Sequence, residues 1–291
     1  GPSPQPPGEI IDMGTHQMHI HRTGEKNHKP TLVLETGQAL PTEHYHWLSE
    51  GLKDSLRVFR YDRAGIGYSE LSHTPRDPET IARELHELLE VAGEKPPYIM
   101  AGHSFGGLYI RVFTQLYPDE VDAMVFIDAS HPDQRERFNR PDPKDVSWML
   151  SGMALLADAG VMALFDRLNG SILYVDELPK EVNERFYDYT LNGTYYRGFR
   201  EENRWDKSAY QQARTTKDFG DLPIRVFSAG QRYDGTKAKP LWLELQREIA
   251  GLSTNGKQVT VAGHHNSIYT TKENADLICA EILRLAKQRV K

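Results

Sequence analysis

The sequence is short of cysteine, of long apolar runs and of unbalanced charge, and each shortage excludes a class of protein. Cys279 is the only cysteine, so no intramolecular disulfide and no metal site built from cysteines can form. No stretch approaches the roughly 18 apolar residues that a membrane-spanning helix needs, and we expect no membrane span in this chain. The net charge of −6 gives no reason to expect nucleic acid or an anionic membrane as a partner.

The length and the first residues bound the domain organisation. A chain of 291 residues has room for one large core, or for one core with an inserted subdomain. Residues 1–8, GPSPQPPG, are proline-rich and begin with Gly-Pro, so we predict a disordered or tag-derived segment there. A trimmed N-terminus leaves the compartment open, cytoplasmic or exported. The sequence also leaves a choice between monomer and homodimer.

Apolar runs and amphipathic segments alternate from residue 9 onward, after a predicted hairpin over 9–21. Strands are predicted at residues 31–34, 56–61, 98–100, 123–127, 222–229 and 257–261. Helices are predicted between them at 41–54, 77–92, 108–117, 241–252 and 274–288. The short connections indicate an α/β fold in which residues 9–130 and 220–291 form a mostly parallel sheet flanked by helices.

Residues 131–219 break this alternation before the penultimate strand. They show helical periodicity over 148–168, 178–191 and 199–214, no convincing strand, and many Met, Phe, Tyr and Trp residues. We interpret them as a helical cap, either a subdomain with its own core or a lid whose aromatic face covers a site; one insertion can be both.

A Gly-x-Ser-x-Gly motif follows the strand at 98–100, in the stretch Gly102-His103-Ser104-Phe105-Gly106. Strand, motif and then helix is the context of a nucleophile elbow, in which the serine sits on a strained turn at the start of a helix. The glycines at both sides let the strand and the helix approach closely. We therefore predict Ser104 as a nucleophile; the alternative is a glycine-rich turn with an idle serine.

A serine nucleophile needs a base and an acid, which we expect after later strands. Only His264 and His265 follow the last predicted strand, and we favour His265 because it lies further out over the sheet. Two aspartates fit the acid. Asp128 ends an apolar strand, and Asp234 follows the next one in a sequence that is also an ordinary Asp-Gly turn. We favour Asp128.

An oxyanion hole needs two N–H donors, which we assign to Phe105, the residue after the nucleophile, and to Gln38, after the strand at 31–34. We expect the substrate pocket to include Gly37, His44, Trp47 and His103; the alternative for His44 and Trp47 is a plain helix face. We expect no metal site. The histidines of the hairpin at 9–21 lack carboxylates or cysteines at ligand spacing and are predicted to be solvated.

Four stretches together resemble an α/β-hydrolase-fold serine hydrolase, in its bacterial esterase-like branch. They are Leu34-Glu35-Thr36-Gly37, residues 61–69 (YDRAGIGYS), Gly102-His103-Ser104-Phe105-Gly106-Gly107 and residues 128–133 (DASHPD). The resemblance runs from about Ile10 to the C-terminus and is weakest in the cap. One departure is that Thr36-Gly37 stands where the family often has His-Gly.

The resemblance implies a cofactor-free Ser-His-Asp enzyme acting on a small-molecule ester, a lactone or a related acyl compound. Members of this branch often lack a suitable acid after the strand preceding the last, which supports Asp128. We therefore expect a carboxylic-ester hydrolase that works through an acyl-enzyme. The alternatives are an amidase, a peptidase or a C–C bond hydrolase on the same triad, or a ligand-binding protein of this fold without turnover.

Overall fold

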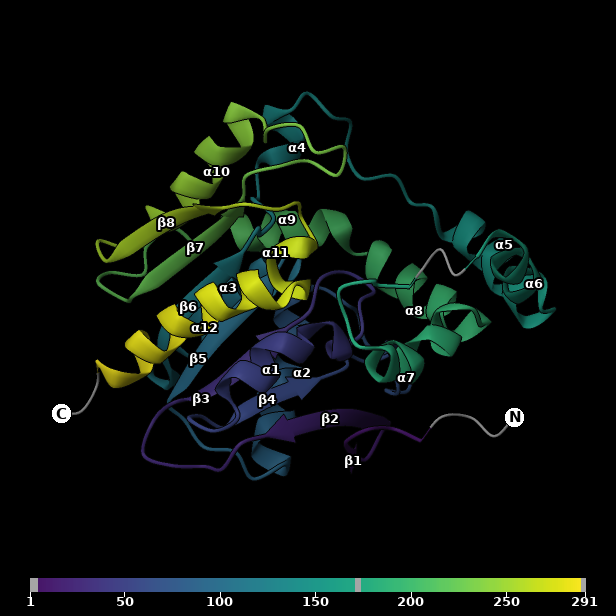
Figure 1. The fold of residues 1–291 in the computed structure, drawn as a ribbon, viewed down its shortest axis with the longest axis horizontal. Coiled ribbons are helices and arrows are strands. Elements are labelled where there is room, and N and C mark those ends of the chain that lie inside the picture. Colours follow the sequence, from purple (N-terminus) through teal and green to yellow (C-terminus); the bar gives the residue numbers. More distant parts are fainter. Residues whose placement is uncertain (1–4, 171–173, 289–291) are drawn as a thin grey trace.

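A computed structural model describes residues 5–170 and 174–288; residues 1–4, half of the predicted disordered segment, lie outside the described residues. The core is an eight-stranded sheet with the order β1-β2-β4-β3-β5-β6-β7-β8 (Figure 1). Its strands are β1 (Glu9–Asp12), β2 (Gln17–Thr23), β3 (Thr31–Glu35), β4 (Val58–Tyr61), β5 (Tyr98–His103), β6 (Val121–Ile127), β7 (Ile224–Ala229) and β8 (Gly256–Val261). β2 is antiparallel to β1 and β4, and the strands from β4 to β8 are parallel. The predicted hairpin and mostly parallel sheet are confirmed.

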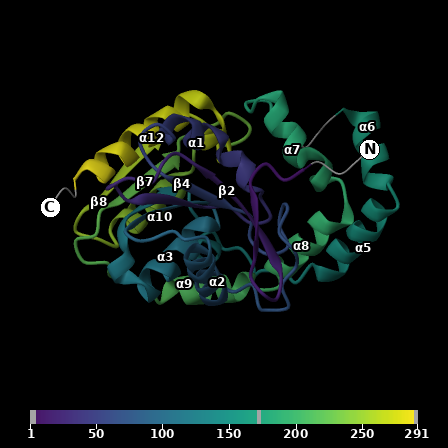
Figure 2. The same ribbon diagram turned by 90° about the horizontal axis from the view of Figure 1, so that it is seen from below.

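Helices cover both faces of the sheet (Figure 2). One face packs against the short turn η1 (Thr42–Tyr45), α1 (His46–Leu52), α11 (Ser267–Thr270) and α12 (Lys272–Lys287). The other packs against α2 (Pro78–Val91), α3 (Gly106–Leu116) and α10 (Pro240–Ala250). Leu32 and Leu34 of β3 contact the first layer and Val33 between them contacts the second. A strand buried on both faces needs apolar residues at successive positions, which explains the continuous apolar runs in the sequence.

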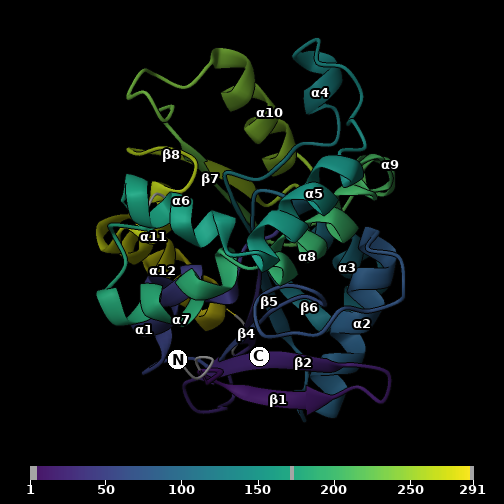
Figure 3. The same ribbon diagram turned by 90° about the vertical axis from the view of Figure 1, so that its right-hand side faces the viewer.

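Between β6 and β7 the described residues form helices and no strand. They are α4 (Gln134–Arg137), α5 (Ser147–Asp158), α6 (Val161–Asn169), α7 (Lys180–Thr190), α8 (Gly193–Asn203) and α9 (Asp206–Arg214). In Figure 1 α5 to α8 lie together at the right of the sheet, and Figure 3, viewed from that side, shows them in front of it. Two predicted helices are each split. The helix expected over 148–168 bends by 80° between α5 and α6, where Gly160 has a φ of 78°.

The α5–α6 pair carries an exposed apolar surface. Eight large apolar side chains on it are exposed: Trp148, Met149, Leu155, Leu156, Val161, Leu164, Phe165 and Leu168. Within the described ranges no single helix has the length and apolarity to cross a membrane, and α5 with α6 is the one bent pair that meets those two criteria jointly.

The hairpin histidines are not solvated as predicted. His19 is fully buried and its Nδ1 lies 2.8 Å from Asp62 Oδ2, while His21 Nδ1 lies 2.6 Å from Glu43 Oε1. His19 Nε2 also accepts a hydrogen bond from the Gly8 N–H at 3.1 Å. The two carboxylates lie 22 and 43 positions later in the chain than their histidines, so the local spacing of the hairpin could not predict these contacts.

We predict that the close packing of α8 on the loop after β4 makes Gly198 irreplaceable. A Cβ on Gly198 would lie 1.9 Å from the carbonyl oxygen of Gly65, a backbone atom. Gly198→Ala should therefore lower the free energy of unfolding by about 2 kcal/mol through overpacking. The matched control is Gly152→Ala in α5, where nothing lies within 4 Å of the added methyl group. Because alanine favours helix, this variant should gain about 0.5–1 kcal/mol. Urea unfolding measures both, and an unchanged Gly198→Ala would contradict the packing.

Candidate active site

Ser104 occupies a sharp turn between β5 and α3, with a backbone φ of 52° that residues other than glycine rarely adopt. The flanking glycines explain how the turn closes. A Cβ on Gly102 would lie 2.5 Å from the carbonyl carbon of Gly106, and one on Gly106 would lie 2.5 Å from the Glu35 carbonyl oxygen. Neither distance is possible between real atoms, so both positions require glycine. The strand, turn and helix are those that the motif predicts.

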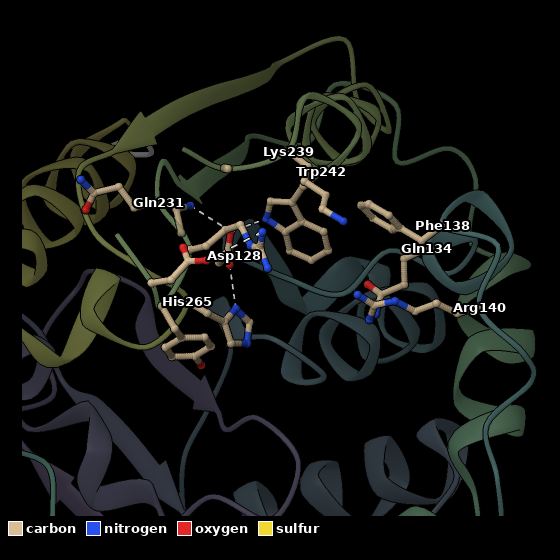
Figure 4. A pocket seen from close by; sticks show the side chains of 13 residues that line it. Asp128, Gln134, Phe138, Arg140, Gln231, Lys239, Trp242 and His265 are labelled. Atoms are coloured by element: carbon tan, nitrogen blue, oxygen red, sulfur yellow. Dashed lines mark hydrogen bonds and ion pairs between the residues drawn. The ribbon is translucent and has the colours of Figure 1, made fainter. Parts of the chain in front are cut away.

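The carboxylate of Asp128 lies next to the imidazole of His265. Asp128 Oδ2 is 2.6 Å from His265 Nδ1, and Oδ1 accepts hydrogen bonds from the Ala229 N–H at 2.9 Å and from Trp242 Nε1–H at 2.8 Å (Figure 4). A carboxylate oxygen accepts in such a contact, so the neutral tautomer of His265 that fits it has its proton on Nδ1 and its lone pair on Nε2. The three donors satisfy a side chain that is almost fully buried.

Asp234, the alternative acid, has a different environment. Its Oδ1 accepts hydrogen bonds from the Thr236 N–H at 3.0 Å and from the Thr236 hydroxyl, and these bonds lower the pKa of the exposed Asp234 carboxyl. These bonds close the Asp-Gly turn that was the other interpretation of this stretch of the sequence. Of the two candidates, the structure brings Asp128 to the histidine and leaves Asp234 in a surface turn.

The choice between His264 and His265 is also visible in the geometry. His264 Nδ1 accepts hydrogen bonds from the N–H groups of Asn266 and Ser267, at 3.3 and 3.4 Å, and its ring lies 4.7 Å from that of Tyr233. It shapes the loop, whereas the ring of His265 reaches Asp128.

His103 requires a correction, because it was predicted to line the substrate pocket. Its side chain is buried, with its ring 4.5 Å from that of His265 and 4.3 Å from that of Tyr269. Its Nε2–H donates to the backbone carbonyl of His265 at 2.7 Å, which fixes the loop that carries the histidine. Burial lowers the pKa of His103 well below its usual value, so the ring is neutral. Sequence reasoning missed this supporting role.

The loop after β3 lies against the elbow. A Cβ on Gly37 would lie 3.4 Å from Ser104 Cβ and 3.2 Å from His103 Nδ1. Across the described ranges, neither the Gln38 N–H nor the Phe105 N–H donates a hydrogen bond to a protein atom. These are the two groups predicted as oxyanion donors. Unpaired N–H groups at a buried or half-buried site are uncommon and mark positions where a ligand atom is expected.

Arg63 fixes the orientation of this loop. Its buried guanidinium donates to the carbonyl oxygens of Thr36 and Gly37, each at 2.7 Å, and to Glu35 Oε1 at 2.6 Å. In a trans peptide the C=O and the following N–H point in opposite directions. Because Arg63 holds the Gly37 carbonyl, the Gln38 N–H points away from the guanidinium. The sequence motif that contains Arg63 gave no sign of this contact, since its partners lie 26 to 28 residues earlier.

Two acidic residues of the helical segment contact the same loop. Glu202 of α8 accepts from Arg63 Nε at 2.8 Å and from the Ala39 N–H at 2.7 Å. Asp206 of α9 accepts from the Gln38 side-chain amide, and its other oxygen accepts from Asn203 Nδ2 at 3.0 Å. Burial raises the pKa of Asp206 to about 6. The segment 131–219 is therefore hydrogen bonded to the loop that carries Gln38.

A cavity of about 440 Å³ adjoins the Asp128–His265 pair (Figure 4). It is lined by the two site residues together with Gln134, Phe138, Arg140, Ala229, Gln231, Arg232, Tyr233, Asp234, Ala238, Lys239 and Trp242. Among the described residues of segment 131–219, those that line this wall lie in and just after α4.

The residues predicted for the pocket wall lie outside this cavity. Gly37 contacts the elbow, while His44 and Trp47 contact the helical segment. The ring of His44 lies 4.8 Å from that of Phe186, and Trp47 Nε1–H donates to the Glu177 carbonyl at 2.9 Å. Burial lowers the pKa of His44 to about 4. Both side chains belong to the contact between η1–α1 and α7. As regards metals, the described residues hold no group of three or more His, Cys, Asp or Glu side chains placed as ligands.

The raised pKa of Asp206 predicts a pH-dependent stability. The folded-state pKa, about 6, lies above the ordinary 3.8, so ionisation of Asp206 disfavours the folded state. Its contribution to the free energy of unfolding should fall by about 2 kcal/mol between roughly pH 4 and pH 7. Asp206→Asn removes this titration, so the difference between wild type and variant should shrink or reverse as the pH rises. Urea unfolding at both pH values measures it, with the exposed Asp221→Asn as control. Parallel pH curves for wild type and Asp206→Asn would contradict the assignment.

Comparisons with known proteins agree with this architecture. The family model of the alpha/beta hydrolase fold matches residues 30–230. YbdG of Bacillus subtilis (strain 168) is 29% identical over 178 residues, which cover 60% of this chain and 52% of YbdG, so the chain spans about half of that relative. An AB hydrolase superfamily protein of Gibberella zeae is 26% identical over 290 residues, covering 89% of this chain and 87% of that protein.

Solved structures show the same fold at low sequence identity. A thermophilic esterase from Thermogutta terrifontis superposes with a TM-score of 0.65 at 17% identity, over 96% of this chain and 99% of that one. The family model takes in more than half of the 291 residues. The chain therefore belongs to the alpha/beta hydrolase fold family.

Proposed function

We propose that the protein is a serine hydrolase that cleaves carboxylic esters, or lactones, through an acyl-enzyme. Ser104 is the nucleophile, His265 the general base and Asp128 the acid that orients it. The observation that carries the proposal is the contact between Asp128 and His265. His265 follows β8, the last strand of the sheet, and Ser104 lies on the turn after β5 of the same sheet. A buried carboxylate that holds a histidine in one tautomer is the support a serine nucleophile needs.

In the proposed reaction, the Ser104 oxygen attacks the ester carbonyl while its proton passes to His265 Nε2. A bond forms between the serine oxygen and the carbonyl carbon, and the carbonyl π electrons move to its oxygen. When the tetrahedral intermediate collapses, the bond to the alcohol oxygen breaks and His265 returns the proton to that oxygen. Water then repeats the two steps and releases the acid. The part of the chain that the structure describes holds no Ser104–His265 hydrogen bond, and we expect that bond to form with substrate present.

The N–H groups of Gln38 and Phe105 are proposed to bind the oxyanion. Support comes from their freedom from protein acceptors, from the contact of Gly37 with Ser104, and from the Arg63 contacts that orient the Gln38 peptide. Donors held rigidly before the reaction stabilise the developing charge without reorganising. Removing one such donor typically raises the barrier by about 3 kcal/mol.

The segment 131–219 is proposed to act as a cap on this site. Glu202 and Asp206 attach it to the oxyanion loop, and Gln134, Phe138 and Arg140 place its first part in the cavity wall. Amide or C–C bond hydrolysis on the same residues is the alternative, because the triad chemistry is shared and the fold alone does not choose between substrates. The name of the Thermogutta terrifontis protein agrees with ester hydrolysis, but at 17% identity the likeness extends to the fold only.

Replacing the nucleophile tests the proposal directly. Ser104→Ala should lower kcat with p-nitrophenyl acetate by about 10⁴-fold or more and abolish covalent labelling by a fluorophosphonate, because no other group can form the acyl-enzyme. Circular dichroism should show an unchanged fold. If the variant keeps more than a tenth of the wild-type rate, Ser104 is not the nucleophile. A wild-type protein that neither turns over esters nor takes up the fluorophosphonate would instead be a ligand-binding member of the family.

The two aspartates provide a matched pair of variants. Asp128→Asn keeps the shape of the side chain but no longer stabilises the imidazolium, so kcat should fall by about 10³–10⁴-fold. Asp234→Asn changes an exposed turn at the edge of the cavity, away from His265, and should cost about 1 kcal/mol of stability or less, with little change in the rate with a small neutral ester. Rates with the same ester and unfolding in urea separate the two effects. A crippled Asp234→Asn beside an active Asp128→Asn would reverse the assignment of the acid.

A further inference from the structure

The cavity beside His265 lies on the side of the site where the alcohol of an ester must leave. In the reaction proposed above, His265 gives its proton to the alcohol oxygen, so the alcohol has to lie within hydrogen-bond reach of that ring. His265 and Asp128 both line the cavity, whereas Ser104, Gly37 and Phe105 do not. Of the two parts of an ester, the alcohol is the one that must reach His265, which makes this cavity the candidate for the alcohol part.

The walls of the cavity are aromatic on two sides. Phe138 comes from the turn after α4, Trp242 from the first turn of α10, and Tyr233 from the loop after β7. The indole nitrogen of Trp242 is hydrogen bonded to Asp128, which fixes the plane of its ring in the wall (Figure 4). Aromatic faces of this kind bind the apolar body of a ligand, with a flat ring preferred.

Three cationic side chains, Arg140, Arg232 and Lys239, line the cavity, and two of them have no carboxylate as an ion-pair partner among the described residues. The guanidinium of Arg140 and the ammonium of Lys239 both lie over the ring of Phe138, 5.5 and 5.6 Å from its centroid. Neither forms an ion pair with a carboxylate in the ranges 5–170 and 174–288. The third cation, Arg232, has Asp234 at 3.9 Å, and the other lining carboxylate, Asp128, is engaged by His265.

The side chains of Arg140 and Lys239 are both exposed, and each lies against the ring of Phe138 at the wall of the cavity. Two cations that share one aromatic ring repel each other, and the ring offsets only part of that repulsion. An anion bound beside Phe138 would offset this repulsion and would accept hydrogen bonds from guanidinium or ammonium groups, as carboxylate oxygens do.

We propose that this cavity binds the alcohol part of the substrate and that this alcohol is a flat or aromatic body carrying an anionic group, of the carboxylate type, held by Arg140 and Lys239. The inference rests on the proposed ester hydrolysis and names the substrate class for it. The proposed preference concerns the leaving group alone. Arg232 contributes less, because Asp234 already offsets its charge.

A pair of esters with the same acyl group tests the proposal. The wild-type protein is assayed with 4-acetoxybenzoate, which releases an anionic phenol, and with 4-acetoxybenzamide, which releases its neutral counterpart. The measured quantity is the ratio of kcat/KM for the two esters. In the double variant Arg140→Gln/Lys239→Gln this ratio should fall by about ten-fold relative to wild type, as expected for the loss of two exposed ion pairs. Comparing the ratio between proteins cancels the intrinsic reactivity of the two phenols.

Lys237→Gln is the matched control, because Lys237 is an exposed lysine two residues from Lys239 that does not line the cavity. It should leave the ratio within about two-fold, since exposed charges away from the ligand are screened by salt. An equal fall in the control and in the double variant would mean that the effect is the general field of the protein, and would overturn the proposal. So would a double variant with the wild-type ratio.

A binding measurement keeps this proposal separate from the proposed catalysis. 4-Hydroxybenzoate is titrated by calorimetry into Ser104→Ala, and into Ser104→Ala combined with the two Gln substitutions. We expect binding to the first protein, about ten-fold weaker binding to the second, and weaker binding of 4-hydroxybenzamide to the first. Binding of the two phenols with equal affinity overturns the anionic subsite even where ester hydrolysis depends on Ser104. If the protein binds the anionic phenol more tightly but does not hydrolyse esters, the anionic subsite is supported and the proposed ester hydrolysis is rejected.

Discussion

The fully buried guanidinium of Arg63 is the constraint on which the arrangement of the site depends. A cation taken out of water needs carboxylates and carbonyls around it, and here they come from three elements: Glu35 at the end of β3, the loop carbonyls of Thr36 and Gly37, and Glu202 of α8. The same contacts therefore neutralise a charge, orient the loop beside Ser104 and hold the helical segment on the sheet. Loss of Arg63 would leave two buried carboxylates without their cation, and loss of Glu202 would also leave the Ala39 N–H without its acceptor.

Such a network specifies geometry more than it adds stability. Buried ion pairs often contribute little net free energy, because the attraction between the charges is offset by their lost hydration. Their partners are nevertheless fixed, since an unpaired charge in the interior is strongly disfavoured. In this protein the network fixes the peptide group between Gly37 and Gln38. The direction of that peptide group decides where its N–H can donate to the oxyanion of a substrate.

Sequence patterns predicted the sheet and the elbow because both depend on local signals. Apolar runs of strand length and a glycine on each side of Ser104 are visible in single windows of the chain. The break between α5 and α6 is marked in the sequence only by Gly160. Because the helical periodicity continues on both sides of this glycine, the sequence predicted one continuous helix. The contacts of Arg63, His103 and Glu202 could not be read, because their partners lie 26 to 163 residues away. The contacts of His44 and Trp47 with the segment around α7 could not be predicted for the same reason, because that segment is distant in the chain.

The left-handed backbone at Ser104 has an evolutionary consequence. A residue with a side chain held at a φ of 52° destabilises the fold by roughly 1–2 kcal/mol, and glycine would remove that strain. Replacing Ser104 by glycine would therefore make the fold more stable. Selection for stability alone, without selection for activity, would favour the loss of this serine. Descendants of this sequence that no longer need turnover should show glycine at this position early, while the core that surrounds it stays intact.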